Sequence, residues 1–230
     1  MGKDKLRRFA ENKNFSNLLQ PEFHDVFRKD FYAKGKWNEL VFKNKNPIIL
    51  ELGCGKGEYT FELARKYQEK NFIGIDIKGA RLWKGAKESS EQNVSNAFFL
   101  RTRIELINSF FDCDEVSEIW ITFPDPHLKK PRTKKRLTSP KFLNYYKHFL
   151  KKDGLIHLKT DSRELHEYTL SVIKKNSINL FIHTNDLYNS IYAEITHGIT
   201  TFYEKKFLQI KKPITYICFN LKTDKLIEEP

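Results

Sequence analysis

Cysteine is scarce in this chain of 230 residues, and its spacing argues against two classes of protein. Cys54, Cys113 and Cys218 are odd in number, lie far apart and form no C-x-x-C pair. A disulfide framework is therefore not expected, and neither is a zinc site built from paired cysteines. The histidines show no metal-ligand spacing, so no metal site is predicted.

Long hydrophobic runs are also missing. No segment approaches the roughly 20 apolar residues that cross a bilayer. The first nine residues are charged and no apolar stretch follows them, which argues against a secretory signal. There is no internal repeat and no low-complexity stretch. These absences predict a cytoplasmic protein without a membrane partner.

What the chain does have is apolar material and positive charge. Hydrophobic residues make up 40% and aromatic residues 14%, which is enough for a sizeable core. Lys and Arg number 41 against 29 Asp and Glu, so the net charge is +12. Such a field attracts polyanions, and nucleic acid is the partner that this charge favours. An anionic membrane surface or simple solubility are the alternatives.

The pattern along the chain changes near Pro47. Residues 1–46 are polar and basic and predict a mobile arm followed by short helices, whereas residues 47–230 predict one catalytic domain. Strands are expected at 48–52, 72–77, 97–100, 119–123, 155–158 and 180–183, with 214–221 closing the sheet. Helices are expected at 59–67, 80–92, 104–110, 140–150 and 165–175. The alternation predicts an α/β fold with a mostly parallel sheet of seven strands covered on both faces, which binds ligands where the strands end.

The loop after the first strand carries a glycine motif. Residues 51–57 are E-L-G-C-G-K-G, a G-x-G-x-G spacing that differs from the G-x-G-x-x-G of dinucleotide sites. Gly53 and Gly55 allow a tight turn and a close approach of a ligand to the backbone. Glu51, at the strand end, suits a cofactor that carries sulfonium and ammonium groups and would repel a pyrophosphate. A tight turn without a ligand is the alternative.

A second acid supports the cofactor hypothesis. Asp76 ends the second strand, 25 residues after Glu51. An acid at this place can accept hydrogen bonds from a ribose diol. Together the two carboxylates indicate binding of S-adenosylmethionine.

The loop after the fourth strand joins an acid to a basic run. Asp125 lies between Pro124 and Pro126, which restrict the backbone and are expected to hold the carboxylate above the cofactor. Six of the ten residues 127–136 are Lys or Arg, and none is acidic. Such a block is typical of a segment that follows phosphates. A loop whose charges only aid solubility is the alternative.

Four motifs occur in the order found in a known family. They are E-L-G-C-G-K-G at 51–57, F-P-D-P at 123–126 with its basic tail, L-K-T-D at 158–161 and T-F-Y-E at 201–204. Over residues 47–221 the chain resembles the bacterial tRNA (guanine-N7)-methyltransferases, the TrmB family. The resemblance implies a Rossmann-like class I methyltransferase that uses S-adenosyl-L-methionine. It implies as target a guanosine in the tRNA variable loop, position 46 in tRNA numbering.

The resemblance also implies roles for particular residues, with Asp125 as the catalytic aspartate. The cofactor contacts would be Glu51, Gly53, Gly55, Asp76, Thr102 and Asp125. The substrate contacts would be Lys129, Asp161, Thr201, Phe202, Tyr203 and Glu204. Two positions depart from the family pattern: Thr102 replaces the acid that meets the adenine, and His127 replaces a Trp.

Guanine N7 has a free lone pair, so its methylation requires no general base. We expect in-line displacement that depends on orientation, with Asp125 accepting hydrogen bonds from guanine. The alternatives are another class I methyltransferase that acts on RNA or a small molecule, and a non-catalytic RNA-binding protein. Asp161 could instead cap the helix that begins near Arg163, and Glu204 could be a surface ion-pair partner. No obligatory protein partner is implied, and both a monomer and a homodimer are compatible with the sequence.

Overall fold

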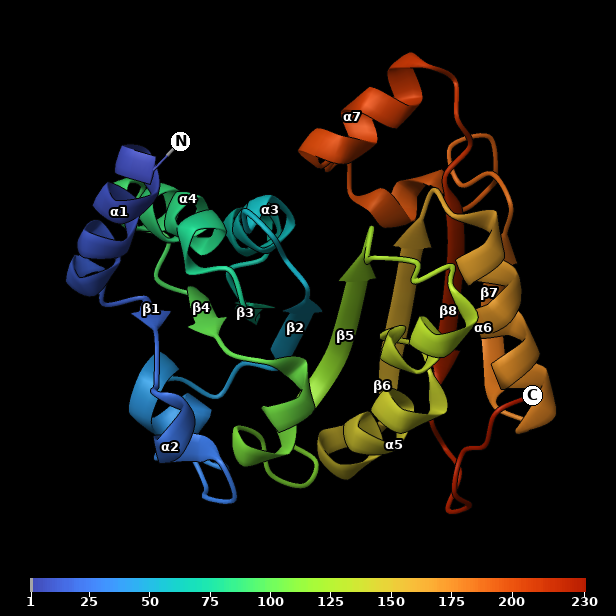
Figure 1. Ribbon diagram of the computed structural model, residues 1–230, viewed down its shortest axis with the longest axis horizontal. Coiled ribbons are helices and arrows are strands. Elements are labelled where there is room, and N and C mark those ends of the chain that lie inside the picture. The colour runs from blue at the N-terminus through green and yellow to red at the C-terminus, as the bar shows by residue number, and fades with distance from the viewer. Residues whose placement is uncertain (1) are drawn as a thin grey trace.

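The computed structural model describes residues 2–230 and contains one open, twisted sheet (Figure 1). Its strands are β1 (Leu18–Leu19), β2 (Ile48–Leu52), β3 (Asn71–Asp76), β4 (Ala97–Arg101), β5 (Val116–Thr122), β6 (Leu150–Thr160), β7 (Asn179–Thr184) and β8 (Thr215–Asn220). They lie in the order β1-β4-β3-β2-β5-β6-β8-β7. Strand β8 runs antiparallel to both of its neighbours, while the pairs from β1 to β6 are parallel.

The α/β class with a mostly parallel sheet is confirmed, but the predicted number of strands is wrong by one. The additional strand is β1, which pairs with β4 through Leu18 opposite Phe99 and Leu19 opposite Leu100. Two residues are too short for an alternating pattern to emerge in the sequence. The pairing extends the sheet at the edge nearest the N-terminus.

Seven α-helices are described in residues 2–230. They are α1 (Gly2–Glu11), α2 (Phe23–Val26), α3 (Glu58–Lys66), α4 (Gly79–Glu91), α5 (Pro140–Phe149), α6 (Arg163–Lys175) and α7 (Phe202–Gln209). The helical segments that are not α-helical are η1 (Asn12–Asn14), η2 (Trp37–Phe42), η3 (Ile104–Ser109), η4 (Lys130–Lys135) and η5 (Ala193–Thr196). Helix α7 projects beyond the carboxyl ends of β5 and β6 (Figure 1).

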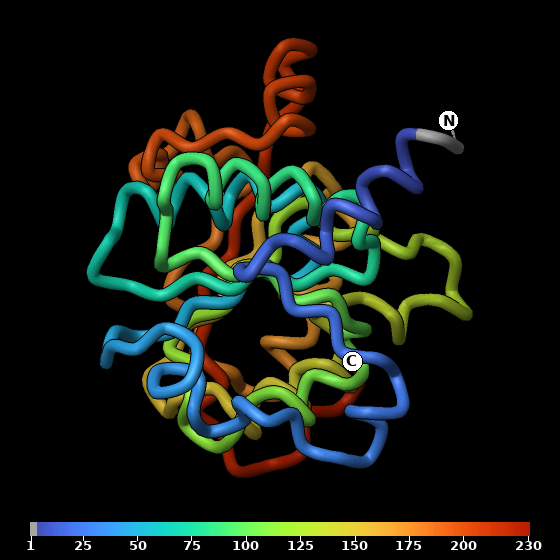
Figure 2. Tube along the Cα trace, turned by 90° about the vertical axis from the view of Figure 1, so that its left-hand side faces the viewer, coloured from blue at the N-terminus to red at the C-terminus, as the bar shows by residue number. Residues whose placement is uncertain are grey.

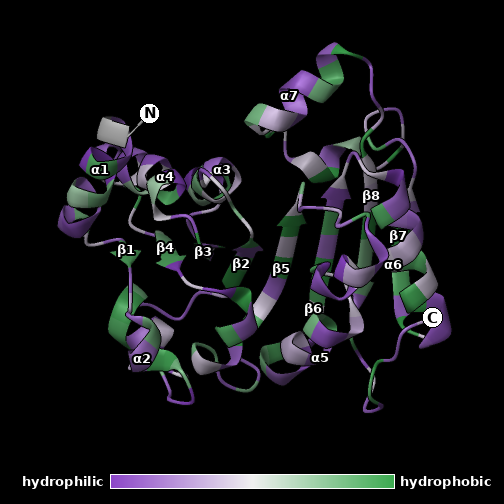
Figure 3. Ribbon diagram, viewed as in Figure 1, coloured by the Kyte–Doolittle hydropathy of each residue, from purple (hydrophilic) through white to green (hydrophobic). Residues whose placement is uncertain are grey.

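A hydrophobic core lies on each face of the sheet because successive strand residues point to opposite sides. Leu50 belongs to the core that contains η2, η3, α5 and α6, whereas Ile49 belongs to the core beneath α3. Strand β2 is buried at every position, as its hydrophobic colour in Figure 3 suggests. This continuous burial is typical of a parallel strand covered on both faces.

The first 46 residues share these cores with the rest of the chain. Trp37 is fully buried and donates from Nε1 to the carbonyl of Phe110 at 2.8 Å. Helix α1 runs along α4 (Figure 2), where Asn12 Nδ2 donates to the carbonyl of Gly79 at 2.9 Å. The basic arm therefore has a defined position beside the edge where the strands end. None of the helices in residues 2–230 is both long enough and apolar enough to cross a membrane.

Candidate active site

A cleft of about 560 Å³ opens at the carboxyl ends of β2, β3, β4 and β5. It contains residues that follow each of these strands, among them Gly53, Asp76, Thr102 and Asp125. A smaller pocket adjoins this cleft, and Gly53 and Phe123 line both the cleft and the pocket. The parallel sheet thus collects loops that are far apart in the sequence into one site, as expected for this class of fold.

Glu51 lies beneath the first turn of α3, where it is almost completely buried. Its Oε2 accepts hydrogen bonds from the backbone N–H of Thr60 at 2.9 Å and from the Thr60 hydroxyl. Its Oε1 accepts from the Thr122 hydroxyl at 2.6 Å. Burial raises the pKa of Glu51 from 4.5 to about 7, although these hydrogen bonds oppose the shift. Glu51 also lines the smaller pocket, so a cation bound there would favour its ionised form.

The glycine loop turns above this carboxylate. Gly53 and Gly55 adopt φ values of 73° and 60°, a left-handed conformation that side chains with a Cβ rarely adopt. Asp76 supports the turn, since its Oδ2 accepts from the N–H of Gly55 at 3.0 Å. Its Oδ1 accepts from the N–H of Lys78 at 2.7 Å. The two acids that the sequence singles out are therefore brought to opposite sides of one glycine turn.

Thr102 follows β4, at the position where the resemblance implies an acid. It lines the cleft together with Ile77 and Ile104, and it is nearly buried. Its hydroxyl makes one long hydrogen bond, 3.5 Å to the carbonyl of Arg103. The cleft beside Thr102 is thus lined by apolar side chains and by the charged residues Lys78, Arg103 and Glu105.

Asp125 stands at the mouth of the cleft on a strained loop. Phe123 and His127 have φ values of 47° and 43°, which are unfavourable for residues with a side chain. The Asp125 side chain is 72% exposed, and its Oδ1 accepts from the N–H of His127 at 3.0 Å. The imidazole Nδ1 of His127 lies 3.6 Å from Oδ2. Strained residues on either side of the Pro-Asp-Pro segment thus accompany the outward position of this carboxylate.

The basic run behind Asp125 divides into two parts. Lys129, Lys130, Arg132, Lys134 and Lys135 are exposed, and most of them lie on η4. Arg136 is the exception, because only 3% of its side chain is exposed. Its Nε donates to the carbonyl of Pro126 at 2.8 Å, and its Nη2 donates to Glu164 at 3.0 Å. Arg136 therefore stabilises the loop that carries Asp125 and is not exposed to solvent. Its place in the basic run suggests a phosphate contact, and the structure does not support that contact.

The T-F-Y-E motif lies above the glycine loop. Thr201, Phe202 and Tyr203 line the smaller pocket together with Glu51 and the glycine turn. The backbone N–H of Phe202 donates to Glu58 at 2.8 Å, and the Phe202 ring centroid lies 4.1 Å from Lys56 Nζ. The motif stands out in the sequence, but the helix that begins at it was not predicted. Thr201 and Glu204 form a capping box, T-x-x-E, which is a signal for the start of α7.

Glu204 itself is fully buried and not a surface ion-pair partner. Its Oε1 lies 2.6 Å from Lys159 Nζ and accepts from the Tyr188 hydroxyl at 2.6 Å. Its Oε2 accepts from the N–H of Thr201 at 3.0 Å. Lys159, in the L-K-T-D motif, and Tyr188 are residues that the sequence analysis does not single out.

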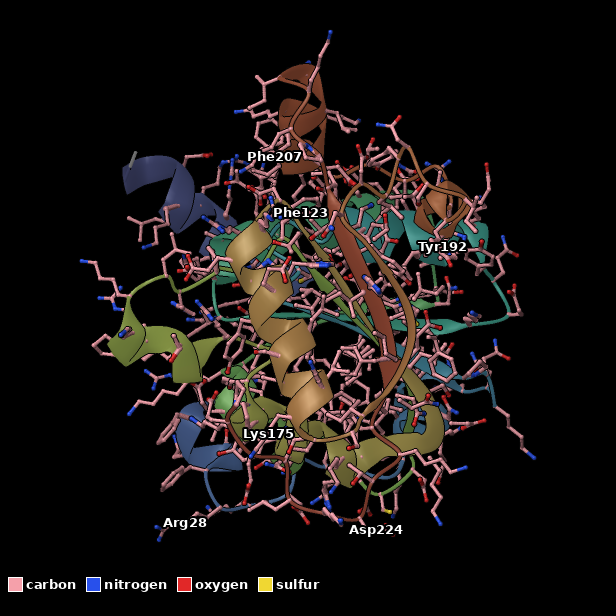
Figure 4. The ribbon with its side chains drawn as sticks, turned by 90° about the vertical axis from the view of Figure 1, so that its right-hand side faces the viewer. Arg28, Phe123, Lys175, Tyr192, Phe207 and Asp224 are labelled. Atoms are coloured by element: carbon pink, nitrogen blue, oxygen red, sulfur yellow. The ribbon has the colours of Figure 1, made fainter. Side chains whose placement is uncertain are left out.

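Helix α7 also contacts the loop of Asp125. The rings of Phe123 and Phe207 lie side by side in Figure 4, with centroids 5.8 Å apart. Asp161 accepts from Lys212 Nζ at 2.5 Å, just beyond the end of α7. It does not cap α6, because Ser162 Oγ accepts the hydrogen bond from the N–H of Leu165. The glycine, F-P-D-P and T-F-Y-E motifs therefore meet around one site, whereas Asp161 lines a separate pocket with Arg163 and Lys212.

The residues present fit S-adenosylmethionine. A buried carboxylate suits its positive groups, the acid that ends β3 suits its ribose, and the volume of the cleft lies within the range of small-molecule sites. The sheet has one antiparallel strand near its edge, and two acids lie where its strands end. Together these features define a class I methyltransferase, the class that uses S-adenosylmethionine as methyl donor.

Comparison with known proteins identifies the family. A protein family described as "Putative methyltransferase" matches residues 45–217. The tRNA (guanine-N(7)-)-methyltransferase of Christiangramia forsetii is 55% identical over 96% of this chain and 99% of its own. The Bacteroides fragilis protein of the same name is 46% identical over 100% of this chain and 90% of its own. The chain belongs to the family of tRNA (guanine-N(7)-)-methyltransferases.

Solved structures bear on the fold alone. The crystal structure of the 16S rRNA methyltransferase KamB superposes with a TM-score of 0.63, at 13% identity, over 86% of this chain and 98% of that chain. This likeness agrees with the class I methyltransferase fold.

Proposed function

We propose that this protein transfers the methyl group of S-adenosylmethionine to N7 of a guanosine in the variable loop of tRNA. The observation that carries the proposal is the position of Asp125. Its exposed carboxylate stands at the mouth of the cofactor cleft, and five exposed cations follow it in the chain. A site that combines a fixed acid with a basic helix suits a purine whose N–H groups need an acceptor and whose neighbours are phosphates.

Each part of the site has one task in this reaction. Glu51 and Asp76 hold the cofactor, which supplies an electrophilic methyl group when bound. Asp125 accepts hydrogen bonds from the guanine N–H groups and offsets the positive charge that develops on the purine. N7 needs no deprotonation, so the protein accelerates the reaction mainly by orienting the base.

The tRNA contacts lie on two sides of Asp125. Lys129 and the exposed cations of η4 bind phosphates on one side. Thr201, Phe202 and Tyr203 contact the substrate on the other, where the exposed rings of Phe202 and Tyr203 can stack on an RNA base. Glu204 acts by fixing this segment, and Asp161 contacts tRNA at the margin of the site. We place the protein in the cytoplasm, where tRNA is available.

The test is to incubate the protein with S-adenosylmethionine and unmodified tRNA and to identify the methylated nucleoside by mass spectrometry. We expect 7-methylguanosine with wild-type protein and a tRNA that has guanosine at position 46, and no product when that base is adenosine. Asp125→Ala should abolish the product. Glu105→Ala is the matched control, because Glu105 is an exposed acid in the same cleft. A different methylated nucleoside would overturn the substrate assignment while leaving the cofactor in place.

A further inference from the structure

Several cations surround the cofactor cleft, and one has a distinct position. Lys78, Arg81, Arg103 and Lys135 line the large cleft, and Lys56 lines the smaller pocket. Of the Lys and Arg side chains in residues 2–230, Arg81 is the one that lines both. It extends from the first turn of α4, beside Asp76, toward the pocket that contains Glu51. Arg81 therefore lies at the junction of the two spaces.

The guanidinium of Arg81 is free to bind a ligand. Farther along α4, Lys84 pairs with Glu58 at 2.9 Å and Lys87 pairs with Glu91 at 3.6 Å. Arg81 forms no ion pair or side-chain hydrogen bond with any other residue in the described part of the chain, and it is exposed. Lys56, by contrast, already lies over the ring of Phe202. An unpaired guanidinium that lines both pockets is suited to an anion that belongs to the ligand.

S-adenosylmethionine carries such an anion. Its sulfonium and ammonium groups are positive and its ribose is neutral, and Glu51 and Asp76 suit these parts. Its methionine carboxylate needs a cation, and the two that line the pocket of Glu51 are Lys56 and Arg81. A guanidinium binds a carboxylate through two parallel hydrogen bonds, a stronger and more directional contact than an ammonium makes.

We propose that Arg81 binds the methionine carboxylate of S-adenosylmethionine and selects the intact cofactor over analogues that lack this group. The proposal rests on the proposed function, since it assumes the same cofactor. It explains why Arg81 reaches the pocket of Glu51 as well as the cleft of Asp76. The carboxylate and the ammonium of one ligand would then be held by Arg81 and Glu51, a basic and an acidic side chain that line the same pocket.

A phosphate of tRNA is the competing ligand for Arg81. The exposed cations at 129–135 follow the Asp125 loop, whereas Arg81 lines the pocket of the buried Glu51. This position favours the cofactor over the RNA backbone. Replacing Arg81 should weaken cofactor binding if it binds the cofactor, and tRNA binding if it binds a phosphate.

The experiment is isothermal titration calorimetry with S-adenosylmethionine and with decarboxylated S-adenosylmethionine, which keeps the sulfonium and the amine. Loss of a charged hydrogen-bonding pair should weaken wild-type binding of the decarboxylated ligand about 10- to 100-fold. Arg81→Ala should bind S-adenosylmethionine about 10- to 100-fold more weakly and leave the affinity for the decarboxylated ligand unchanged. Lys78→Ala is the matched control, because Lys78 immediately precedes α4 and lines the large cleft only. It should keep the wild-type preference.

The outcomes separate the two proposals. If Arg81→Ala keeps the wild-type preference for the carboxylated ligand, the role of Arg81 is wrong while the methyltransferase assignment stands. If Arg81→Ala weakens tRNA binding and leaves both cofactor affinities unchanged, Arg81 binds a phosphate instead. If wild-type protein binds neither ligand, the proposed function itself fails.

Discussion

Lys159 and Glu204 form an ion pair inside the protein, with Nζ 2.6 Å from Oε1 and side chains that are 1% and 0% exposed. Lys159 lies near the end of β6, and Glu204 lies in the first turn of α7. Burial lowers the pKa of Lys159, and the negative charge of Glu204 opposes this shift. Through its other oxygen, Glu204 holds the backbone of Thr201. The pair therefore fixes the beginning of α7 to the sheet.

Breaking this pair should cost more than an ordinary surface substitution. Glu204→Gln leaves a buried ammonium without its counter-charge, so we expect the free energy of unfolding to fall by about 3–5 kcal/mol. Urea denaturation measures the loss, with Lys205→Ala as an exposed neighbour that should change little. The double variant Lys159→Met with Glu204→Leu should recover much of the stability. It should still raise the KM for tRNA, because Thr201 loses its partner. A normal KM in the double variant would contradict the positioning role.

The chemistry of the site could be predicted where it follows strand ends. Glu51 and Asp76 come directly at the ends of buried strands, so a parallel sheet must bring them to one edge. A restricted backbone around Asp125 follows from two prolines next to a strand, whereas the positive φ values of Phe123 and His127 were not predicted. These inferences need only local patterns and the rule that parallel strands end together.

The contacts between distant segments could not be predicted in the same way. The partnership of Lys159 and Glu204 depends on how α7 folds back over β6. Ser162, directly before α6, caps this helix, and Asp161 pairs instead with Lys212, which lies 51 residues further along the chain. Arg136 ends a basic run, yet its side chain is buried because it meets Pro126 and Glu164. In each case the fold supplies a partner that composition does not reveal.

The raised pKa of Glu51 predicts that cofactor binding depends on pH. Burial raises this pKa to about 7, so the carboxyl is mostly protonated at pH 6 and mostly ionised at pH 8. Because the ionised form attracts the positive groups of S-adenosylmethionine, affinity should rise about tenfold over this range. Calorimetry at several pH values measures the affinity of wild type and of Glu51→Gln for S-adenosylmethionine. Protonation of the ligand affects both proteins equally, so it cancels in the ratio of the two affinities. A ratio that stays constant between pH 6 and pH 8 would show that Glu51 does not face the cofactor.

Asp125→Asn should separate chemistry from cofactor binding. The amide keeps the size of the side chain but presents an N–H in place of one acceptor oxygen and removes the negative charge. We expect kcat to fall by about 100-fold or more, as when a group that stabilises transition-state charge is removed. The Kd for S-adenosylmethionine should change less than about threefold, which corresponds to roughly 0.7 kcal/mol. Single-turnover kinetics and calorimetry provide the two values, and equal losses in both would exclude this role.

Two adjacent basic residues should respond differently to truncation. Lys135→Ala removes an exposed cation, so the slope of log affinity for tRNA against log salt should flatten by somewhat under one unit. Arg136→Ala should leave that slope unchanged. It removes buried hydrogen bonds to Pro126 and Glu164, so stability should fall by about 1.5–3 kcal/mol. Filter binding at several salt concentrations measures the slope, and urea denaturation measures the stability. An altered slope for Arg136→Ala would mean that Arg136 contacts a phosphate.

A pair formed by a buried histidine of β6 and a half-buried glutamate of β5 should make stability depend on pH. His157 Nε2 lies 3.2 Å from Glu118 Oε1, and its ring stacks on Trp120 with centroids 4.1 Å apart. Burial opposes the charge of His157, but contacts with Cys218 and Glu118 raise its pKa from 6.5 to about 9. Burial likewise opposes the charge of Glu118, but the hydrogen bond from His157 lowers its pKa from 4.5 to about 2.

The sign of the dependence follows from these directions. The contribution of His157 is complete below pH 6.5 and is lost as the pH rises through 9, while that of Glu118 is complete above pH 4.5 and is lost as the pH falls through 2. Wild type should therefore exceed His157→Gln in the free energy of unfolding by about 3 kcal/mol more at pH 6 than at pH 9.5. Urea denaturation at the two pH values measures this difference. His183→Gln, at an exposed histidine, should show no such change. A difference between wild type and His157→Gln that is independent of pH would mean that His157 is not charged in the folded protein.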